Sequence, residues 1–324
     1  MTARCPGRAA LISLRSPQDA LRPTAIALGS FDGLHQGHRR VIAAVTGEAG
    51  ADLTPSVVSF WPHPREVLHG DTRLRLDLPE DKLELLQPLG IRQLVLVPFN
   101  RQLAALSPAA FVEQVLVGQL QARLVAVGDN FRFGAGRSGD ALALQRIGSG
   151  FGMEVAVLPM LWDGEERVSS SRIRRALAAG DIAEAGRLLE RPYRFSGQVV
   201  QGRGLGRQLG WPTANLQVDG RKFLPLEGVY AAWAWLQDRG PATQGPLPAV
   251  MNLGPQPTVD PDAPSAVEVH LLDGRHNLVG RTLTVEPIAL LRRQQTFADL
   301  DALRVQIGRD ADRARGLCGD QAAG

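Results

Sequence analysis

Two histidines lie three residues apart behind a glycine-rich turn, in the segment 29–38 that reads GSFDGLHQGH. An apolar run enters this turn, and a helix is expected to begin at the histidines, so His35 and His38 would lie near its first turn. The free N–H groups and partial positive charge of a helix start favour phosphate, and histidine can donate hydrogen bonds to phosphate oxygens. Gly37 would leave room for a nucleotide to approach the backbone. The spacing therefore predicts phosphate transfer by positioning and electrostatics without a covalent step, with ordinary residues at a helix start as the alternative.

Further polar positions in the first half could contact a nucleotide. His63 stands between two prolines, which favour an extended backbone, although it could also be a loop histidine in solvent. Asn130 follows a predicted strand, where its amide could hydrogen-bond a ligand. Ser170 and Ser171 precede a predicted helix, so their hydroxyls could cap that helix or bind phosphate. Arg174, in the first turn of the same helix, could bind phosphate oxygens in a forked manner.

A second glycine-rich segment, residues 202–215, reads GRGLGRQLGWPTAN. Its glycines and two arginines would make a flexible loop that could close over phosphates. The segment lacks the Gly-Lys-Ser/Thr ending of a Walker loop, and a proline rather than a long helix follows its last glycine. On spacing alone, a plain turn is as good an interpretation as a phosphate-binding loop.

A carboxylate lies on one face of a predicted strand at residues 267–271, which read VEVHL. The apolar side chains alternate onto one face and leave Glu268 and His270 on the other. A glutamate there could accept a proton from a hydroxyl group. From the residues alone, a solvated glutamate is the more ordinary interpretation.

The elements that must position the N-terminal candidates alternate between strand and helix. Strands are predicted at 24–28, 56–60, 94–97, 123–127 and 153–158, and helices at 37–48, 83–86, 108–117 and 141–147, the helix at 108 being capped by Ser107. Such alternation is typical of βαβ units and a mostly parallel sheet. Ligands in that class bind at the carboxyl ends of the strands.

The second half changes character after a predicted helix pair at 171–179 and 181–189, which Gly180 separates. Strands are predicted at 195–201, 229–236, 248–253, 266–272 and 282–290, which indicates an antiparallel barrel or sandwich. A final helix at 298–308 would carry Leu300, Leu303 and Ile307 on one face. Residues 237–248 are expected to form a surface loop. The predicted domains are therefore 1–185 and 186–324.

Length and composition limit the classes of protein to which this chain can belong. A chain of 324 residues favours two domains. The net charge of +3 and the lack of a long basic tract argue against nucleic acid as a partner. Two cysteines near opposite ends form neither a disulfide framework nor a metal-binding pattern. The apolar stretch 9–14 is too short for a signal peptide, and no run approaches the roughly 18 residues that span a bilayer, so we expect a soluble cytoplasmic enzyme.

Taken in order, these motifs resemble those of prokaryotic bifunctional FAD synthetases over roughly residues 24–310. Segment 29–38 is similar to the signature of the nucleotidylyltransferase superfamily, and 60–64, 128–134 and 169–174 are similar to three further elements of the FMN adenylyltransferase module. Ser171 replaces the usual threonine in the last of these. Segments 202–215, 224–231, 252–258 and 267–271 resemble riboflavin kinase motifs, the first ending in Gly-x-Pro-Thr-Ala-Asn.

The resemblance implies a Rossmann-like nucleotidylyltransferase domain with a parallel sheet, followed by an antiparallel riboflavin kinase β-barrel with a terminal helix. It implies that riboflavin and ATP give FMN, and that FMN and ATP give FAD, with Mg²⁺ at both steps. Thr213 and Asn215 would hold Mg²⁺ and nucleotide phosphates, and Glu268 would be the general base for the ribityl hydroxyl. His35, His38 and Arg174 would stabilise the phosphates. Nucleotide or flavin contacts are implied for Gly29, Phe31, Asp32, Gly37, His63, Asn130, Ser170, Ser171, Gly202, Gly204, Arg207, Gly210, Pro212 and Asn252.

One position departs from the family pattern. Members commonly carry Leu-Arg-x-Glu-x-x-Phe before the last helix, whereas residues 291–297 read LRRQQTF, so Gln294 stands where the glutamate would be. A carboxylate partner could thus be lost. The alternative prediction is that one activity alone is retained and the other module is a flavin-binding scaffold. In both cases the expected partners are small molecules, ATP and flavins, rather than nucleic acid or membrane.

Overall fold

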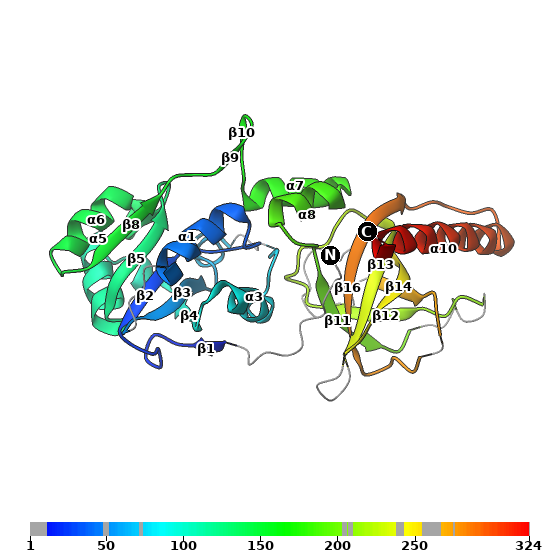
Figure 1. Cartoon of the computed structure of the whole chain (residues 1–324), viewed down its shortest axis with the longest axis horizontal. Coiled ribbons are helices and arrows are strands. Elements are labelled where there is room, and N and C mark those ends of the chain that lie inside the picture. The colour runs from blue at the N-terminus through cyan, green and yellow to red at the C-terminus, as the bar shows by residue number, and fades with distance from the viewer. Residues whose placement is uncertain are drawn as a thin grey trace. The chain divides into compact units, whose positions relative to one another are not determined.

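The computed structural model describes residues 12–47, 52–70, 74–202, 206, 210–237, 243–254, 267–274 and 276–323. Contacts between residues divide the chain into an N-terminal unit, Ala10–Ser170, and a C-terminal unit, Ser171–Gly324 (Figure 1). The helix pair that follows residue 170 is thus grouped with the C-terminal unit. The domain boundary at 185/186 stays a prediction.

The N-terminal unit is built on a six-stranded sheet in the order β1-β4-β3-β2-β5-β8. Its strands are β1 (Ser13–Arg15), β2 (Thr24–Leu28), β3 (Thr54–Trp61), β4 (Gln93–Pro98), β5 (Ala122–Gly128) and β8 (Glu154–Leu158). All the neighbouring strands are parallel. Every residue of β2 is buried, as expected for a parallel strand covered on both faces. The predicted parallel α/β fold is confirmed.

Helices cover both faces of this sheet. The helical segments are α1 (Gln36–Gly47), α2 (Pro64–His69), α3 (Pro79–Leu86), η1 (Gln87–Leu89), α4 (Arg101–Ala104), α5 (Pro108–Phe111), the π-helical η2 (Val112–Gln119), η3 (Ala135–Arg137) and α6 (Ala141–Ser149). Neighbouring β3 residues point to opposite sides: Val57 packs in a core with Ile42 of α1, and Val58 packs in a second core with Phe111 of α5. As predicted, Ser107 caps α5 by accepting a hydrogen bond from the Ala110 amide at 3.2 Å.

Two short hairpins complete the N-terminal unit. They are β6 (Arg132–Phe133) with β7 (Gly139–Asp140), and β9 (Trp162–Asp163) with β10 (Glu166–Arg167). Neither hairpin was predicted, because strands of two residues carry no alternation. Helices α2 and α4 were likewise too short to show a helical period.

The C-terminal unit is a closed barrel in the order β11-β12-β15-β14-β13-β16, with every neighbouring pair antiparallel. Its strands are β11 (Phe195–Val200), β12 (Ala214–Val218), β13 (Gly228–Gln237), β14 (Thr243–Leu253), β15 (Val267–Leu271) and β16 (Thr282–Arg292). Helices α7 (Ser170–Ala179) and α8 (Ile182–Leu189) precede it. The predicted barrel is confirmed, and the sandwich alternative is wrong.

Two predictions about the C-terminal strands are corrected. The sequence prediction missed β12, because it assigned Asn215 to the end of the glycine loop. The prediction of a surface loop at 237–248 is wrong from Thr243 onward, since β14 begins there and pairs with β13, while residues 238–242 lie outside the described residues. Pro248 is paired with Trp233, whereas Gly245 and Pro246 lie at an irregularity of the ladder opposite residues 234–236 of β13.

The terminal helix α10 (Leu300–Ala323) is longer than the predicted 298–308 and packs through other residues. Leu300 is 57% exposed, whereas Ala311 and Ala314 are fully buried against Val229 and Ala231 of β13. The expected apolar face is therefore corrected at Leu300, while Leu303 and Ile307 are half-buried; the small alanines let the helix approach the barrel closely. Figure 1 shows α10 beside β13 and β14. Among the described residues, none of the helices is both long and apolar enough for a membrane span.

Candidate active sites

The loop between β2 and α1 has an unusual backbone at the carboxyl edge of the sheet. Phe31 and Leu34 have φ angles of 46° and 44°, and Gly33 has a φ of 92°. Non-glycine residues adopt positive φ at an energetic cost, and such residues cluster at functional sites. The Phe31 and Leu34 side chains are 2% and 1% exposed, so their burial holds the loop in this form.

This loop brings His35 and His38 together as predicted. Their rings are stacked with centroids 3.7 Å apart, and the Phe31 ring meets His38 edge-on at 5.3 Å. The His38 backbone N–H donates to Nδ1 of His35 at 3.4 Å, so that nitrogen accepts and the proton of a neutral His35 lies on Nε2. A Cβ on Gly37 would lie 3.3 Å from the His35 ring. Gly37 therefore gives this imidazole room, and the predicted approach of a nucleotide there stays a prediction.

Both imidazoles are held in the neutral form. Burial, assisted by the positive charge of Arg167, lowers the pKa of His35 to about 4. Burial also lowers the pKa of His38 well below its ordinary value, and the neighbouring His35 and Lys82 act in the same direction. Nδ1 of His38 is buried and has no hydrogen-bond partner in the described part of the chain. The pair can thus offer hydrogen bonds to a ligand without carrying charge at neutral pH.

Asp32 and Ser170 hold the loop in place. Oδ1 of Asp32 accepts hydrogen bonds from the backbone amides of Leu76 at 2.9 Å and Asp77 at 3.3 Å. Oγ of Ser170 donates to the Asp32 carbonyl at 2.8 Å. Gly29 lies against the ring of Phe31. The contacts described for Asp32 and Ser170 are structural, and their predicted contacts with nucleotide stay predictions.

Lys82 and Arg75 are polar residues near this loop that the sequence reasoning missed. Nζ of Lys82 donates to the Ser30 carbonyl at 2.9 Å, and burial lowers the pKa of this lysine although Asp32 and Asp77 oppose the shift. Both residues line a small cavity with Ser30, Ser59 and His63. One signal was available: Lys82 and Lys222 are the only lysines among 36 basic residues.

His63 and Asn130 lie at loop positions near the strand ends. His63 is the extended N-cap of α2, with Nδ1 accepting from the Arg65 amide at 3.2 Å. The extended backbone was predicted, whereas the capping role was not. Asn130 is exposed in the turn after β5, and its Oδ1 lies 3.2 Å from where a Cβ on Gly128 would be. Ligand contacts of both residues stay predictions.

Ser171 and Arg174 lie on α7 in the C-terminal unit. Ser171 is exposed, and the Arg174 guanidinium lies 5.9 Å from the centroid of the Phe223 ring. Their predicted contact with the phosphates at His35 and His38 stays a prediction.

In the barrel, strand register aligns three of the predicted site residues. Asn215 on β12 is paired with Glu268 on β15, and Glu268 is paired with Asn252 on β14. Directly paired residues point to the same face, with Cβ atoms about 4.5–5.5 Å apart. The buried residues of β14, Met251 and Leu253, alternate with Asn252, so this row faces outward and is half-buried. We call Asn215, Glu268 and Asn252 the polar row.

Two described glycines of the segment 202–215 lie close to residues of the predicted site. A Cβ on Gly202 would lie 1.9 Å from Nδ2 of Asn215, and one on Gly206 would lie 3.1 Å from Oγ1 of Thr213. An alanine at position 202 would have to displace the Asn215 side chain or the backbone, and a Cβ on Gly206 would also lie 2.4 Å from the Trp211 carbonyl oxygen, so the backbone would have to shift there. The predicted contact residues Gly204 and Arg207 lie outside the described residues. Gly210 lies in the left-handed region, with a φ of 85°.

His270 supports the segment that leads into β12. Its Nδ1 lies 2.7 Å from the carbonyl oxygen of Pro212, and Trp211 meets its ring edge-on at 5.2 Å. Because a carbonyl can only accept, the proton of a neutral His270 lies on Nδ1. This contact fixes the start of β12 and hence Thr213.

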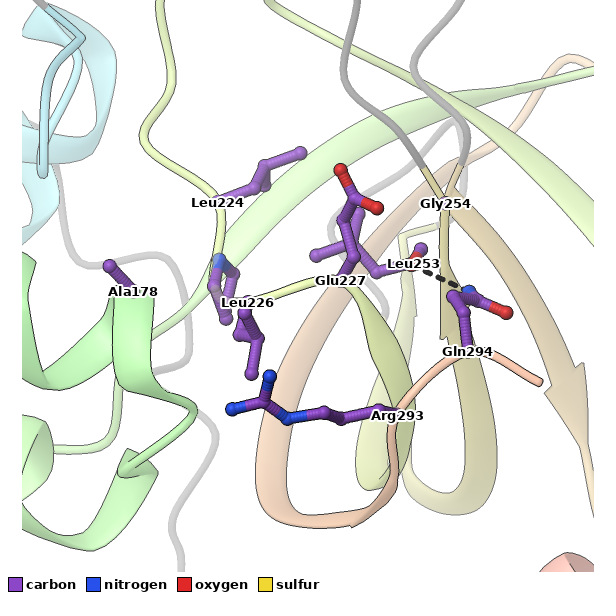
Figure 2. A pocket seen from close by; sticks show the side chains of 9 residues that line it. Ala178, Leu224, Leu226, Glu227, Leu253, Gly254, Arg293 and Gln294 are labelled. Carbon is purple, nitrogen blue, oxygen red and sulfur yellow. Dashed lines mark hydrogen bonds between the residues drawn. The ribbon is translucent and has the colours of Figure 1, made fainter.

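A pocket of about 440 Å³ lies next to the polar row. Its lining is mixed: the apolar residues are Ala178, Leu224, Pro225, Leu226 and Leu253, and the polar residues are Glu227, Arg293 and Gln294. In Figure 2 the Gln294 amide reaches the Leu253 carbonyl, a hydrogen bond of 2.9 Å. The amide also donates to Oδ1 of Asn252 at 2.8 Å. Sequence reasoning noted Gln294 as a departure but did not predict this pocket.

The two halves of the chain match two classes of enzyme. The family model described as FAD synthetase matches residues 17–172, and the one described as riboflavin kinase matches residues 189–318. The bifunctional riboflavin kinase/FMN adenylyltransferase of Escherichia coli K12 is 38% identical over 307 residues, which cover 94% of this chain and 95% of that protein. The Pseudomonas fluorescens protein of the same name is 41% identical over 299 residues, covering 91% and 93%. The chain therefore belongs to the bifunctional riboflavin kinase/FMN adenylyltransferase family.

A solved structure is similar over nearly the whole chain. The crystal structure of a protein from Streptococcus pneumoniae, named a macrolide-efflux protein, has a TM-score of 0.81 and is 28% identical. The likeness covers 94% of this chain and 99% of that one. It supports the combination of a parallel sheet and a closed barrel in one chain.

Proposed function

We propose that this chain phosphorylates riboflavin with ATP to give FMN, and then transfers the adenylyl group of a second ATP to FMN, giving FAD and pyrophosphate. The observation that carries the proposal is the polar row, which aligns Asn215, Glu268 and Asn252 beside a glycine loop. The family membership of the whole chain supports both steps. Because ATP serves both steps, the proposal fits the cytoplasmic location expected from the sequence.

For the kinase step, Glu268 is the general base. Its carboxylate takes the proton from the ribityl 5′-hydroxyl, whose oxygen attacks the γ-phosphorus of ATP while ADP leaves. The glycine loop covers the nucleotide phosphates from the side of Asn215 and Thr213. The reaction needs little covalent chemistry from the protein, so positioning of the hydroxyl and the phosphates supplies most of the rate.

Thr213 and Asn215 fit the proposed magnesium site. Their side-chain oxygens are hard ligands, and Mg²⁺ typically takes a few protein ligands together with substrate phosphates and water. No group of three or more His, Cys, Asp or Glu that could hold a metal occurs among the described residues. A site completed by ATP therefore fits this barrel better than an all-protein cage. When bound, Mg²⁺ would neutralise charge on the transferring phosphate.

For the adenylyl step, the stacked histidines at the start of α1 are the phosphate site. A phosphate oxygen of FMN attacks the α-phosphorus of ATP, and pyrophosphate leaves. Neutral His35 and His38 donate hydrogen bonds to the oxygens on which charge develops. The N–H groups at the start of α1 favour the same negative charge. Arg174, His63 and Asn130 are proposed to contact phosphate or flavin at this step.

The pocket beside the polar row would receive the flavin ring of riboflavin. Its volume of about 440 Å³ lies within the range of roughly 300–1,000 Å³ that small-molecule sites have. The leucines can cover the faces of the ring, and Glu227, Arg293 and Gln294 offer polar partners for its heteroatoms. The hydrogen bond between Gln294 and Asn252 connects this pocket to the polar row, so a ribityl chain leaving the pocket could extend toward Glu268.

Conversion of riboflavin tests the proposed function. Purified full-length protein is incubated with riboflavin, ATP and Mg²⁺, and flavins are separated by chromatography over time. FMN is expected first and FAD second, with ADP and pyrophosphate as coproducts and no reaction when ATP is omitted. A folded protein that forms neither FMN nor FAD would refute the proposal, and accumulation of FMN alone would favour the alternative of one retained activity.

A further inference from the structure

The hydrogen bonds of Gln294 fix the direction of its side-chain amide. The atom 2.9 Å from the Leu253 carbonyl must be the amide nitrogen, because a carbonyl can only accept. The same nitrogen lies 2.8 Å from the side chain of Asn252, so the Asn252 atom facing it must be the acceptor Oδ1. The Nδ2 group of Asn252 therefore points away from Gln294.

Strand order shows on which side Gln294 approaches. In the barrel, β14 lies between β15 and β13, and β16 lies beyond β13. Asn252 is paired with Glu268 on one side and with Val229 on the other, and Val229 is paired with Arg292 of β16. Gln294 follows Arg292 by two residues, so it reaches Asn252 from the β13 side. The Nδ2 group of Asn252 is thus left on the side of Glu268.

We propose that Gln294 is a positioning residue for the kinase step. It holds the Asn252 side chain so that Nδ2 of Asn252 lies on the side of Glu268, where the substrate hydroxyl is activated. The inference rests on the proposed kinase function. Asn252 held in this way donates toward the reacting groups, and without Gln294 its side chain can adopt other rotamers.

The amide also explains how this chain accommodates a departure from the family pattern. A glutamate at position 294 could hold Asn252 only by accepting from its Nδ2, which would turn Oδ1 toward Glu268 instead. A glutamine and a glutamate therefore both restrain Asn252, but with opposite amide directions. In this chain the Leu253 carbonyl gives the glutamine a second acceptor that a carboxylate could not use.

The test replaces Gln294 with leucine, which keeps the bulk and removes the donor. In steady-state assays of the full chain, Q294L is expected to lower kcat for riboflavin phosphorylation by about tenfold and to change KM for ATP by less than about twofold. Conversion of supplied FMN to FAD should be unchanged, and every thermal unfolding transition of the full chain should match the wild type, which shows that the barrel of the variant is folded. The matched control is Q198L, since Gln198 is an exposed residue of β11 in the same barrel, and wild-type rates are expected.

A double-mutant cycle separates action through Asn252 from general support of the pocket. If Gln294 acts through Asn252, adding Q294L to N252A should change kcat by less than about twofold. Additive losses, a wild-type kcat for Q294L, or a loss confined to KM for riboflavin would each overturn the inference. Wild-type protein is assayed first: if it does not phosphorylate riboflavin, the proposed function fails, whereas an active wild type with an unaffected Q294L refutes the inference about Gln294 alone.

Discussion

At the scale of single residues, the N-terminal site depends on two histidines that burial keeps uncharged. His35 is 6% exposed, and its Nδ1 already accepts a backbone hydrogen bond, so its remaining ring nitrogen is a donor. A neutral donor can contact phosphate oxygens throughout the reaction without the cost of desolvating a charged imidazolium. Gly37 and Asp32 serve this arrangement by making room for the His35 ring and by anchoring the loop.

The pKa of His35 predicts a pH dependence of stability. With a pKa of about 4 in the folded chain and about 6.5 when unfolded, the unfolded chain binds more protons between these values. The N-terminal unit should thus be fully stable above pH 6.5 and lose a few kcal/mol of unfolding free energy as the pH falls toward 4. Calorimetry of the full chain from pH 7 to 4.5 measures this, and H35N should show a shallower decline.

Replacement of an exposed histidine provides the control for this experiment. His69 is exposed at the end of α2, so H69N should retain the wild-type pH dependence. A chain with two units need not unfold in one step. The comparison between variants therefore uses the calorimetric unfolding transition that the H35N substitution shifts. A wild-type stability that is constant down to pH 4.5, or an equal decline in H35N, would contradict the burial of a neutral His35.

Many site residues were predictable from the sequence because each motif is a short run in which type and spacing are visible. The pairing of His35 with His38 and the outward face of Glu268 follow from helical and strand periods. The roles of Asp32 and His63 were not visible, since their partners are backbone groups such as the Leu76 amide. Lys82 was missed because a lone lysine carries no pattern.

At the scale of elements, strand register creates the proposed kinase site. The polar row draws one residue from each of three strands: Asn215, Glu268 and Asn252. These residues are far apart in the sequence and share no motif, and strand pairing alone brings them into one row. The sequence predicted five barrel strands and missed β12, whose polar residues follow Pro212. Without β12 the alignment of Asn215 with Glu268 could not be deduced. The packing of α10 through Ala311 and Ala314 was also hidden, because alanine gives a weak apolar signal.

The close approach of the glycine loop gives a prediction at this scale. A Cβ at position 202 would lie 1.9 Å from Nδ2 of Asn215, so G202A must displace the loop or the Asn215 side chain. The rate of riboflavin phosphorylation should fall by about tenfold or more, the equivalent of at least about 1.4 kcal/mol, while adenylylation of supplied FMN should be unchanged. Parallel chromatographic assays of both reactions measure the effect.

Gly316 in α10 is the matched control for this substitution. A Cβ on Gly316 would contact nothing within 4 Å, and alanine is favoured over glycine within a helix by up to about 1 kcal/mol. G316A should therefore keep the wild-type kinase rate and be as stable as the wild type or more so. A wild-type kinase rate in G202A would show that the close approach of residue 202 to the Asn215 side chain does not matter for the reaction.

At the scale of the whole molecule, the chain combines two units whose chemistries use the same cosubstrate differently. The N-terminal unit holds two stacked histidines at a helix start, and the C-terminal unit aligns a carboxylate with an asparagine that we propose as a magnesium ligand. Both halves match their own family model, so the residues of one site can be changed without touching those of the other. We therefore expect the two activities of this chain to be separable by mutation.

The most direct measurement follows flavins by chromatography in matched reactions of E268Q and H38N with ATP and Mg²⁺. From riboflavin, E268Q should lose FMN formation by about a hundredfold or more, yet convert supplied FMN to FAD at the wild-type rate. H38N should form FMN at the wild-type rate and accumulate it, with little FAD. If either substitution abolished both reactions in a folded protein, or if neither reduced its own reaction, the assignment of two separate sites would be contradicted.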